Sequence, residues 1–327
     1  IGTTPGSVVR KTLKGADYLY YQYRDLDGST RQAYIGADNP ESRALTARLT
    51  MRAASRSESL RRLDELRAAF VALGGHAVDH APLRVLLGFA DAGMLQPKSG
   101  PAVLVGTHAF HVLGNLLGVK WAGTQTARAS ASGNEADLDL ALRDPERAAP
   151  GLREQLGRGF LPAPTLDPRA PLAFYTVRGQ TVRVNLLAPP GQSDAGTVAV
   201  PALNTMARPQ PFLDYLLEAP VPAVVVGRRT LALVTVPAPG RFALYKLLLS
   251  ESREAMFAAR SEEDRQQAMQ LVDVLIREEP EELAVAHEAL LQRGKSWSDV
   301  LGRALRKCER QYPEAVLQLR ALSSPVA

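Results

Sequence analysis

The segment that most constrains the fold of this chain is a short apolar run, Ala102 to Val105, followed at once by Gly106 and Thr107 and later by the acidic pair Asp137 and Asp139. Residues i and i+2 of a β-strand point to the same face, so the two aspartates are expected to project side by side while the leucine between them faces a core. Magnesium takes one or two protein carboxylates together with the phosphates of its substrate. The pattern therefore points to phosphoryl or nucleotidyl transfer.

Length and composition are those of an ordinary globular protein. With 327 residues, 46% of them hydrophobic, the chain is long enough for two or three domains with packed cores. No apolar run approaches the roughly 18 residues that span a bilayer, and the first 30 residues carry charges and tyrosines where a signal peptide would be apolar. We therefore expect no membrane association. Because the chain begins at Ile1 rather than at a methionine, we expect a short N-terminal segment to precede it.

Charge and cysteine content add weaker constraints. The 39 basic and 34 acidic residues give a net charge of +5 and a pI near 9.4, which favours polyanionic partners only weakly. The one cysteine, Cys308, rules out an intramolecular disulfide and a cysteine-based zinc site, so the reducing cytoplasm is the expected location. Cys308 ends an amphipathic stripe that starts at Trp297, so we expect a buried core thiol rather than a reactive one.

Shifts in composition divide the chain into three expected domains, residues 1–97, 98–237 and 238–327. The first boundary falls at the turn-like sequence of residues 98–101, and the second lies within the Pro-Ala-Pro sequence of residues 237–239. The character of the chain is helical from that second boundary onward.

The N-terminal domain is expected to combine a hairpin with helices. Tyrosine-rich runs flank Asp27 and Gly28, a turn signal that predicts a β-hairpin over residues 18–36. Leucine and phenylalanine residues at helical spacing predict helices over residues 40–73 and 82–95.

The central domain is expected to be a mixed sheet with an intervening helix. Its expected elements are a strand at 102–105, a helix at 107–117, a polar loop at 124–135, a strand at 137–142, a hairpin of strands at 174–177 and 181–187, and strands at 221–226 and 231–236 that complete the sheet.

Several segments together resemble a known family. They are Val103 to Phe110 (Val-Leu-Val-Gly-Thr-His-Ala-Phe), Leu117 to Trp121, Ala136 to Ala141, and Val236 to Leu247. With the tyrosine hairpin, their order and spacing are similar to the bacterial branch of the polymerase β-like nucleotidyltransferase superfamily, and more closely to a family of nucleotidyltransferase-fold proteins. The similarity covers most of the chain. It implies an α+β fold: a polymerase β-like mixed sheet core with an N-terminal β-hairpin plus helices and a C-terminal helical domain.

The resemblance also implies a site. Gly106 and Thr107 would form the nucleotide-binding turn that holds the triphosphate, since glycine permits close backbone approach and a helix N-terminus offers N–H groups. Asp137 and Asp139 would hold the metal ions of a two-metal Mg²⁺ site. Lys246, on a later helix, would add positive charge to the nucleotide-binding side.

The third acid of such a site is replaced in this chain. Asn185 stands on a neighbouring strand, at the place where relatives carry the third carboxylate. An amide offers a carbonyl oxygen to a metal but cannot take a proton, so we expect transfer to be slower by about 10²- to 10⁴-fold. Glu135 or Asp194 would be alternative acids, and we expect Asn185→Asp to raise transfer.

Each candidate also has a plainer interpretation. Asp137 and Asp139 could be a solvated strand end, and Gly106 only a tight turn between strand and helix. Lys246 could be a lysine that extends along an apolar surface to water.

Other clusters are expected to be structural. His108 and His111 lack a third ligand at zinc spacing and are expected to be partly buried histidines of a packed helix. Arg48, Arg52 and Arg56 fall on one helix face, which is more often solvated than RNA-binding. The hairpin tyrosines could stack bases but are expected to pack on neighbouring helices.

The preferred function is a magnesium-dependent nucleotidyltransferase that moves a nucleoside monophosphate from an NTP to a hydroxyl acceptor, with Asp137, Asp139 and Asn185 as its catalytic residues. RNA, a protein and a small molecule all remain open as the acceptor, and toxins of toxin-antitoxin systems within the superfamily make growth inhibition a subsidiary hypothesis.

Two alternatives are a catalytically degenerate nucleotide-binding or regulatory protein, because of Asn185, and an RNA-binding module that uses the arginine-rich helix and the tyrosine hairpin.

Overall fold

The computed structural model of the chain describes residues 6–24, 29–97, 99–122, 137–145, 160–162, 174–177, 182–191, 197–201, 205–228, 230–253 and 257–322. The strands are β1 (Gly6–Leu13), β2 (Ala16–Arg24), β3 (Thr30–Ala37), β4 (Ala102–Val105), β5 (Asp137–Leu142), β6 (Phe160–Pro162), β7 (Phe174–Val177), β8 (Arg183–Ala188), β9 (Val198–Val200), β10 (Thr205–Pro209), β11 (Val221–Val226) and β12 (Leu231–Val236). The helices are α1 (Pro40–Ala72), α2 (His80–Asp91), α3 (Gly106–Leu117), α5 (Leu213–Leu216), α6 (Pro239–Ser252), α7 (Ala258–Glu278), α8 (Pro280–Leu291), α9 (Lys295–Cys308) and α10 (Pro313–Ala321).

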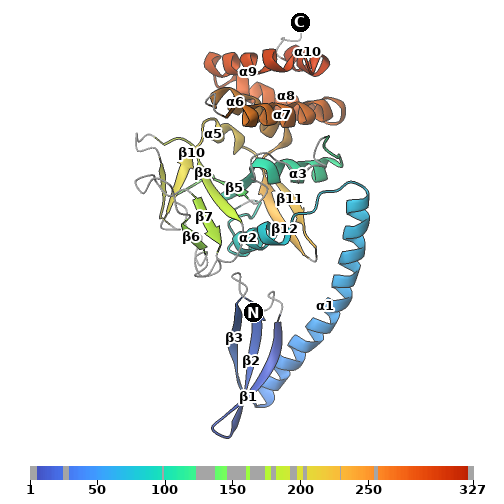
Figure 1. Cartoon of the computed structure of the whole chain (residues 1–327), viewed down its shortest axis with the longest axis vertical. Helices are drawn as coiled ribbons and strands as arrows, with labels where there is room; N and C mark the ends of the chain where they lie inside the picture. Colours follow the sequence, from blue (N-terminus) through green and yellow to red (C-terminus); the bar gives the residue numbers. More distant parts are fainter. Residues whose placement is uncertain are drawn as a thin grey trace.

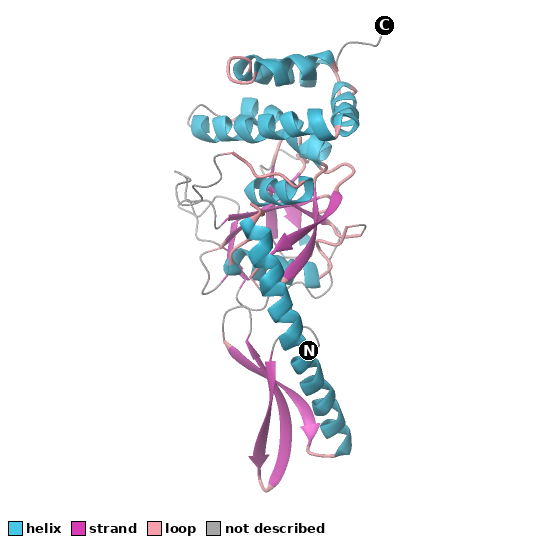
Figure 2. Cartoon of the chain, turned by 90° about the vertical axis from the view of Figure 1, so that its right-hand side faces the viewer, coloured by secondary structure: helices cyan, strands magenta, loops and turns pink. Residues whose placement is uncertain are grey.

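The molecule is elongated, and its parts follow one another along the long axis in chain order (Figure 1). The sheet of β1, β2 and β3 lies at one end, and α1 runs from it to the central mixed sheet. Helices α6 to α10 stack at the other end, which Figure 2 shows from the side. The predicted α+β class with a helical C-terminal region is confirmed.

The N-terminal sheet contains the expected hairpin and an additional strand. Strands β2 and β3 pair antiparallel as predicted, and β1 pairs antiparallel with the other edge of β2. Strand β1 was not predicted from the sequence. The turn residues Asp27 and Gly28 lie outside the described residues.

Helix α1 begins where its sequence provides a cap. The side chain of Asn39 accepts a hydrogen bond from the N–H of Ser42, and the Ser42 hydroxyl accepts one from the N–H of Asn39. This reciprocal capping box satisfies donors that a helix start leaves open, and Pro40 suits the first turn because it has no N–H to satisfy. The sequence therefore fixes this helix start locally.

The central sheet has the order β4-β5-β8-β10-β9, with β7 also pairing with β8 and β6 with β7. Strand β5 pairs antiparallel with β4 and parallel with β8, so the sheet is mixed. Strands β7 and β8 pair antiparallel, which confirms the expected hairpin. The polar loop predicted at 124–135 lies outside the described residues.

The expectation that β11 and β12 complete the central sheet is wrong. These strands pair with each other in a separate antiparallel sheet, and β12 packs against β4 and α2. The Thr235 hydroxyl of β12 donates a hydrogen bond to the carbonyl of Leu95 at 2.8 Å. An apolar run predicts a strand, but its hydrogen-bonding partner depends on tertiary contacts.

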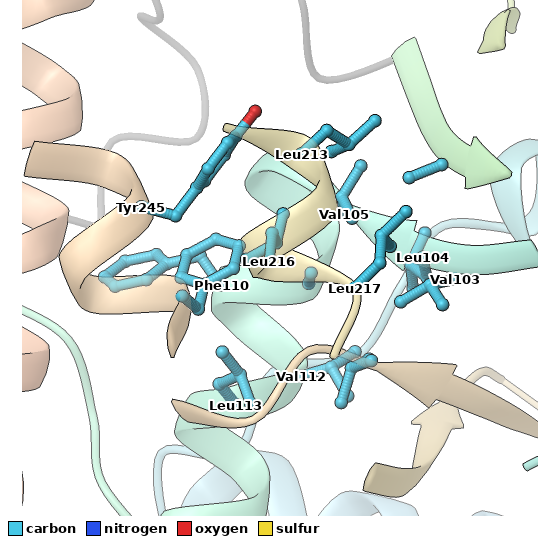
Figure 3. Packing of buried hydrophobic residues seen from close by; sticks show 14 of the residues in the cluster. Val103, Leu104, Val105, Phe110, Val112, Leu113, Leu213, Leu216, Leu217 and Tyr245 are labelled. Carbon is cyan, nitrogen blue, oxygen red and sulfur yellow. The ribbon is translucent and has the colours of Figure 1, made fainter. Parts of the chain in front are cut away.

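The core beneath the central sheet joins β4, α3, α5 and α6. Figure 3 shows Val103, Leu104 and Val105 of β4 near Phe110 of α3 and the leucines of α5. The Trp121 ring stacks on Phe110 with centroids 4.6 Å apart. This packing anchors α3, the helix that begins at Gly106.

The C-terminal helices are organised around α6, which is buried along most of its length and packs against α7, α8 and α9. Cys308 of α9 is buried as predicted, and burial raises the pKa of its thiol to about 11. A thiol with that pKa stays protonated near neutral pH, which supports a packing role. Within the described ranges, no helix has the length and apolar character needed to cross a bilayer.

Candidate active site

Strand register places Asp139 at the centre of the candidate site. On one side of β5, Val105 of β4 lies opposite Asp139, and on the other side Asn185 of β8 does. Asp137 pairs in the same way with Arg183 of β8. The leucines at the alternate positions of β5 are fully buried, as the period of two predicts, while both aspartates stay partly exposed.

The glycine turn and the acidic strand meet directly. Gly106 has a φ of +70°, a left-handed conformation that glycine adopts without strain. A Cβ built on Gly106 would overlap Oδ2 of Asp139. The backbone of the turn therefore lies against the carboxylate, and a residue with a side chain at this position would displace it.

Asn185 is tied to Asp139 by a short hydrogen bond. Its amide Nδ2 donates to Oδ1 of Asp139 at 2.6 Å. Asn185 is only 8% exposed, and its own Oδ1 is buried without a hydrogen-bond partner among the described residues. Because a buried acceptor without a donor is costly, this oxygen is available to a cation or a water.

Both aspartates are held where the charged form is disfavoured. Burial raises the pKa of Asp139, opposed by the Asn185 hydrogen bond and by the charges of Arg208 and Lys246. Burial also raises the pKa of Asp137, opposed mainly by the charge of Arg183. A divalent cation would favour the ionised form of both groups.

Basic side chains from the second half of the chain converge on this acidic centre. Arg208 of β10, Lys246 of α6 and Arg260 of α7 all act electrostatically on Asp139. Arg208 in turn is affected by Arg253, at the end of α6, and burial lowers its pKa. Cations from three different elements thus act on this one carboxylate.

Lys246 is engaged in a buried ion pair. Its Nζ lies 2.6 Å from Oδ1 of Asp264, and Nε of Arg253 lies 2.7 Å from the other oxygen of the same carboxylate. Lys246 is 6% exposed and Asp264 is 3% exposed, so Lys246 does not extend to water. Asp264 holds Lys246 and Arg253 in fixed positions, and no residue within α6 predicts this link.

The start of α3 can receive an anion. The residue before it is Val105, whose side chain provides no cap hydrogen bond. The first N–H groups of a helix have no partner within the helix, and they carry the positive end of its dipole. Gly106 and Thr107 are partly exposed and form this end of the helix.

The two histidines of α3 are packed against the rest of the structure. The His111 ring stacks on His76 with centroids 4.0 Å apart, and burial lowers the pKa of His111 to about 3. His108 is 9% exposed. The alternative acids Glu135 and Asp194 lie outside the described residues.

The donor set fits magnesium better than zinc. Asp137, Asp139 and Asn185 supply oxygen atoms only, and Mg²⁺ prefers carboxylate and carbonyl oxygen. Among the residues that the structure describes, no group of three or more His, Cys, Asp or Glu side chains is positioned to hold a metal ion. The site thus supplies two carboxylates and an amide oxygen, a set that leaves coordination positions to substrate phosphates and water.

A mixed sheet with an Asp-x-Asp strand beside a glycine turn at a helix start defines a nucleotidyltransferase-like protein. The chain belongs to a nucleotidyltransferase family, whose model matches residues 80–292. No curated protein and no solved structure shows a significant match to it. The family match contains all the predicted site residues and leaves the N-terminal sheet and α1 outside.

The arginines near the acidic pair were not predicted from the sequence. Arg208, Arg253 and Arg260 come from different elements, and no local motif distinguishes them from the other arginines of the chain. Only the tertiary arrangement of β10, α6 and α7 brings them close to Asp139 and to one another. To predict these arginines from the sequence, one would need to know which distant residues are in contact.

Proposed function

We propose that the chain is a magnesium-dependent nucleotidyltransferase that moves a nucleoside monophosphate from an NTP to a hydroxyl group and releases pyrophosphate. The observation that carries the proposal is the meeting of Asp139, Gly106 and Asn185 beside the start of α3. Membership of a nucleotidyltransferase family supports the transferase class.

The phosphates of the NTP would bind at the start of α3. Gly106 lets the backbone approach them closely, and the N–H groups of the first turn donate to phosphate oxygens. Arg208, Lys246 and Arg260 would offset the negative charge of the triphosphate, because their charges already reach Asp139. Fixed cations of this kind need no rearrangement during the reaction.

Asp137 and Asp139 would hold the magnesium, which when bound neutralises charge that develops on the transferred phosphoryl group. Asn185 fixes one oxygen of Asp139 through its Nδ2 and leaves the other oxygen against the glycine turn. The unpartnered Oδ1 of Asn185 would add a neutral oxygen ligand.

Asn185 also limits the rate. Its amide cannot accept the proton of an attacking hydroxyl, so this position supplies no general base. Loss of a general base typically costs about 10²- to 10⁴-fold in rate. We therefore expect a slow transferase.

Nucleotide binding tests the proposal first. Isothermal titration with ATP, GTP, CTP and UTP, with and without Mg²⁺, should show binding of at least one NTP that requires Mg²⁺. Asp137→Asn keeps the shape of the side chain and removes its charge, so this binding should be lost. Equal binding by the variant and the parent chain would contradict the assignment of the acidic pair.

Transfer is tested with α-labelled NTPs and cell extract. Label should enter a macromolecular or small-molecule product, and its sensitivity to ribonuclease or protease assigns the acceptor to RNA, protein or neither. If the acceptor is essential to cells, induced expression should slow growth, as for a toxin, and Asp139→Asn should relieve this effect.

A catalytically degenerate nucleotide-binding protein is the second candidate, and Asn185 favours it. Such a protein would bind Mg²⁺ and NTP as above and yet transfer no label. Asn185→Asp separates the two candidates, because a transferase limited by this position should gain activity and a regulatory protein should not.

A further inference from the structure

The N-terminal sheet presents one face to solvent, which we call the outer face. Strand register places Lys11, Tyr18, Tyr20, Gln22, Gln32 and Tyr34 on it. Side-chain contacts agree with this register. The Gln32 amide donates to the Gln22 side chain at 2.9 Å, and the Tyr34 ring contacts both other tyrosines.

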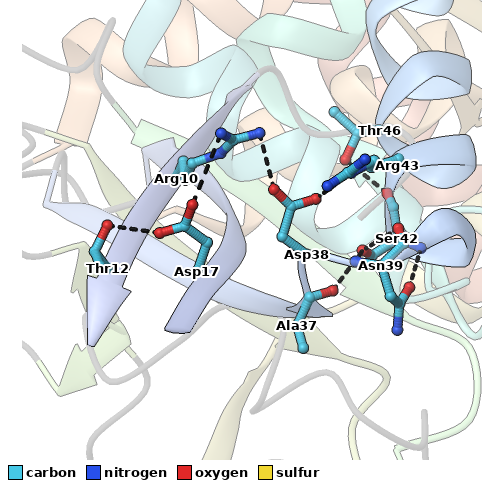
Figure 4. Close-up of polar contacts among 9 residues, drawn as sticks. All are labelled: Arg10, Thr12, Asp17, Ala37, Asp38, Asn39, Ser42, Arg43 and Thr46. Carbon is cyan, nitrogen blue, oxygen red and sulfur yellow. Dashed lines mark hydrogen bonds and ion pairs between the residues drawn. The ribbon is translucent and has the colours of Figure 1, made fainter. Parts of the chain in front are cut away.

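The opposite face of the sheet is already occupied. It carries the buried Leu19 and Tyr21 and faces α1. Asp38 links the two elements, because it pairs with Arg10 of β1 and with Arg43 of α1 (Figure 4). Helix α1 therefore lies against this face and not against the outer face.

The outer face is aromatic and basic. The ring centroids of Tyr18 and Tyr20 lie 6.2 and 5.4 Å from that of Tyr34, with interplanar angles of 48° and 59°. Tyr34 is 57% exposed. The ammonium group of Lys11 lies 5.2 Å from the Tyr20 ring centroid.

Among the described residues of the three strands, no acidic side chain lies on this face. Within strands β1, β2 and β3 the one acidic residue is Asp17, which accepts a hydrogen bond from Thr12 and pairs with Arg10 on the helix side. Lys11 and Arg24 project to the outer side. A surface with cations, aromatic rings and, among its described residues, no carboxylate is complementary to an anionic chain that carries flat bases.

We propose that the outer face of the N-terminal sheet binds a single strand of nucleic acid. Tyr18, Tyr20 and Tyr34 stack on unpaired bases, Lys11 and Arg24 contact the phosphate backbone, and Gln22 and Gln32 hydrogen-bond to base edges. A duplex does not fit this chemistry, because its base faces are covered by their neighbours. The site lies outside the region that the family match covers, and it is independent of the acidic pair.

Fluorescence anisotropy with the full chain tests the proposal. The probes are a labelled single-stranded RNA, a single-stranded DNA of the same sequence and the corresponding DNA duplex, each without NTP or Mg²⁺. We expect both single strands to bind more tightly than the duplex, with an affinity that falls as salt is raised. The comparison of RNA with DNA identifies which strand the face prefers.

Substitutions assign the binding to the outer face. Tyr34→Ala removes one exposed ring and should weaken binding about 5- to 150-fold, the loss of one base stack. Tyr34→Phe keeps the ring and should bind like the parent chain. Lys11→Gln should reduce both affinity and salt dependence, whereas Lys295→Gln, on an exposed ion pair of α9, should change neither.

Several outcomes would overturn the proposal. These are tighter binding of the duplex, no binding of either single strand at low salt, or unchanged binding by Tyr34→Ala. A chain that self-associates in sedimentation, and becomes monomeric through Tyr34→Ala, would assign the face to a second copy instead. Asp137→Asn should bind the strand normally, so a failure of the transferase assignment is distinguishable from a failure of this site.

Discussion

At the residue scale, the carboxylate of Asp139 leaves no space for a side chain at Gly106. Two glycines at the ends of α3 have similar left-handed backbones, Gly106 with φ +70° and Gly118 with φ +67°. A Cβ on Gly118 would meet no atom within 4 Å, whereas one on Gly106 would overlap Asp139. An alanine at Gly118 therefore tests only the strain of the left-handed backbone. An alanine at Gly106 tests the same strain together with the contact to Asp139.

Gly118→Ala should lower the free energy of unfolding by about 1–2 kcal/mol, the cost of a left-handed residue with a side chain. Gly106→Ala should lower it further and should also abolish Mg²⁺-dependent NTP binding, because Asp139 is displaced. Urea unfolding and isothermal titration measure the two effects. Equal stability and equal binding of the two variants would contradict the contact.

Asn185 has a structural role beside its place in the site. In Asn185→Asp, two adjacent carboxylates replace a hydrogen bond of 2.6 Å, so the metal-free chain should lose about 1–3 kcal/mol at neutral pH. Mg²⁺ should restore this stability more strongly than it stabilises the parent chain, and transfer should rise. Thermal unfolding at increasing MgCl₂ concentrations measures this effect. If Mg²⁺ does not change the stability of the variant, the role of Asn185 as a neighbour of the metal site is contradicted.

At the scale of elements, the buried carboxylate of Asp264 links α7 to α6. It pairs with Lys246 within α6 and with Arg253 just after that helix. The side chains of Lys246 and Asp264 are 8% and 4% exposed, so water screens this pair poorly. An exposed pair of α7, Arg277 and Asp273, provides a matched control with side chains about 60% exposed.

Asp264→Asn leaves Lys246 and Arg253 without their shared counter-charge. We expect a loss of about 3–5 kcal/mol in the free energy of unfolding, as for other buried pairs from which one partner is removed. Asp273→Asn should change it by less than about 1 kcal/mol. Chemical denaturation of both variants decides whether the buried pair matters for the C-terminal helices.

The contact between α3 and the segment before α2 should depend on pH. Burial lowers the pKa of His111 from 6.5 to about 3, so below pH 6.5 the unfolded chain binds a proton that the folded chain excludes. The contribution of the neutral, buried His111 to the free energy of unfolding is therefore complete above pH 6.5. It decreases between pH 6.5 and pH 3 by at most about 1.4 kcal/mol per pH unit.

His111→Phe keeps a ring against His76 and removes this titration. The fall in stability between pH 7 and pH 5 should be smaller in this variant than in the parent chain, as measured by urea unfolding at each pH. His80→Gln, at an exposed position, serves as the control substitution. An unchanged slope in His111→Phe would contradict the role of the buried ring.

At the scale of the whole molecule, the two proposed sites lie on different parts of the chain. The acidic site belongs to the central sheet and the helices around α6, and the outer face belongs to the sheet at the far end of α1 (Figures 1 and 2). An acceptor strand held by the outer face would be tethered to the transferase by α1.

Hydrogen exchange should show this separation. Mg²⁺ and NTP should slow exchange in residues 102–117, 137–142, 239–253 and 257–264, which carry most of the residues of the candidate site, and leave residues 6–24 and 29–37 unchanged. A single-stranded oligonucleotide should produce the opposite pattern. Protection of the N-terminal sheet by NTP alone would indicate that the two sites are coupled.

The sequence by itself determined the acidic strand and the positions of most of the helices and longer strands. Alternation with a period of two placed Asp137 and Asp139 on one face of β5, and the apolar run before Gly106 placed a helix start at the turn. The capping sequence at Asn39 fixed the start of α1 in the same way. These features depend on residues only a few positions apart, so local patterns are sufficient to predict them.

Only the tertiary structure decided which elements meet. The pairing of Asp139 with Asn185, the gathering of Arg208 and Arg260, and the separate sheet of β11 and β12 all join residues distant in the chain. The same holds for the tyrosines, since strand pairing and the position of α1 determine which of them face solvent. Such contacts depend on packing over the whole fold, and no local periodicity encodes them.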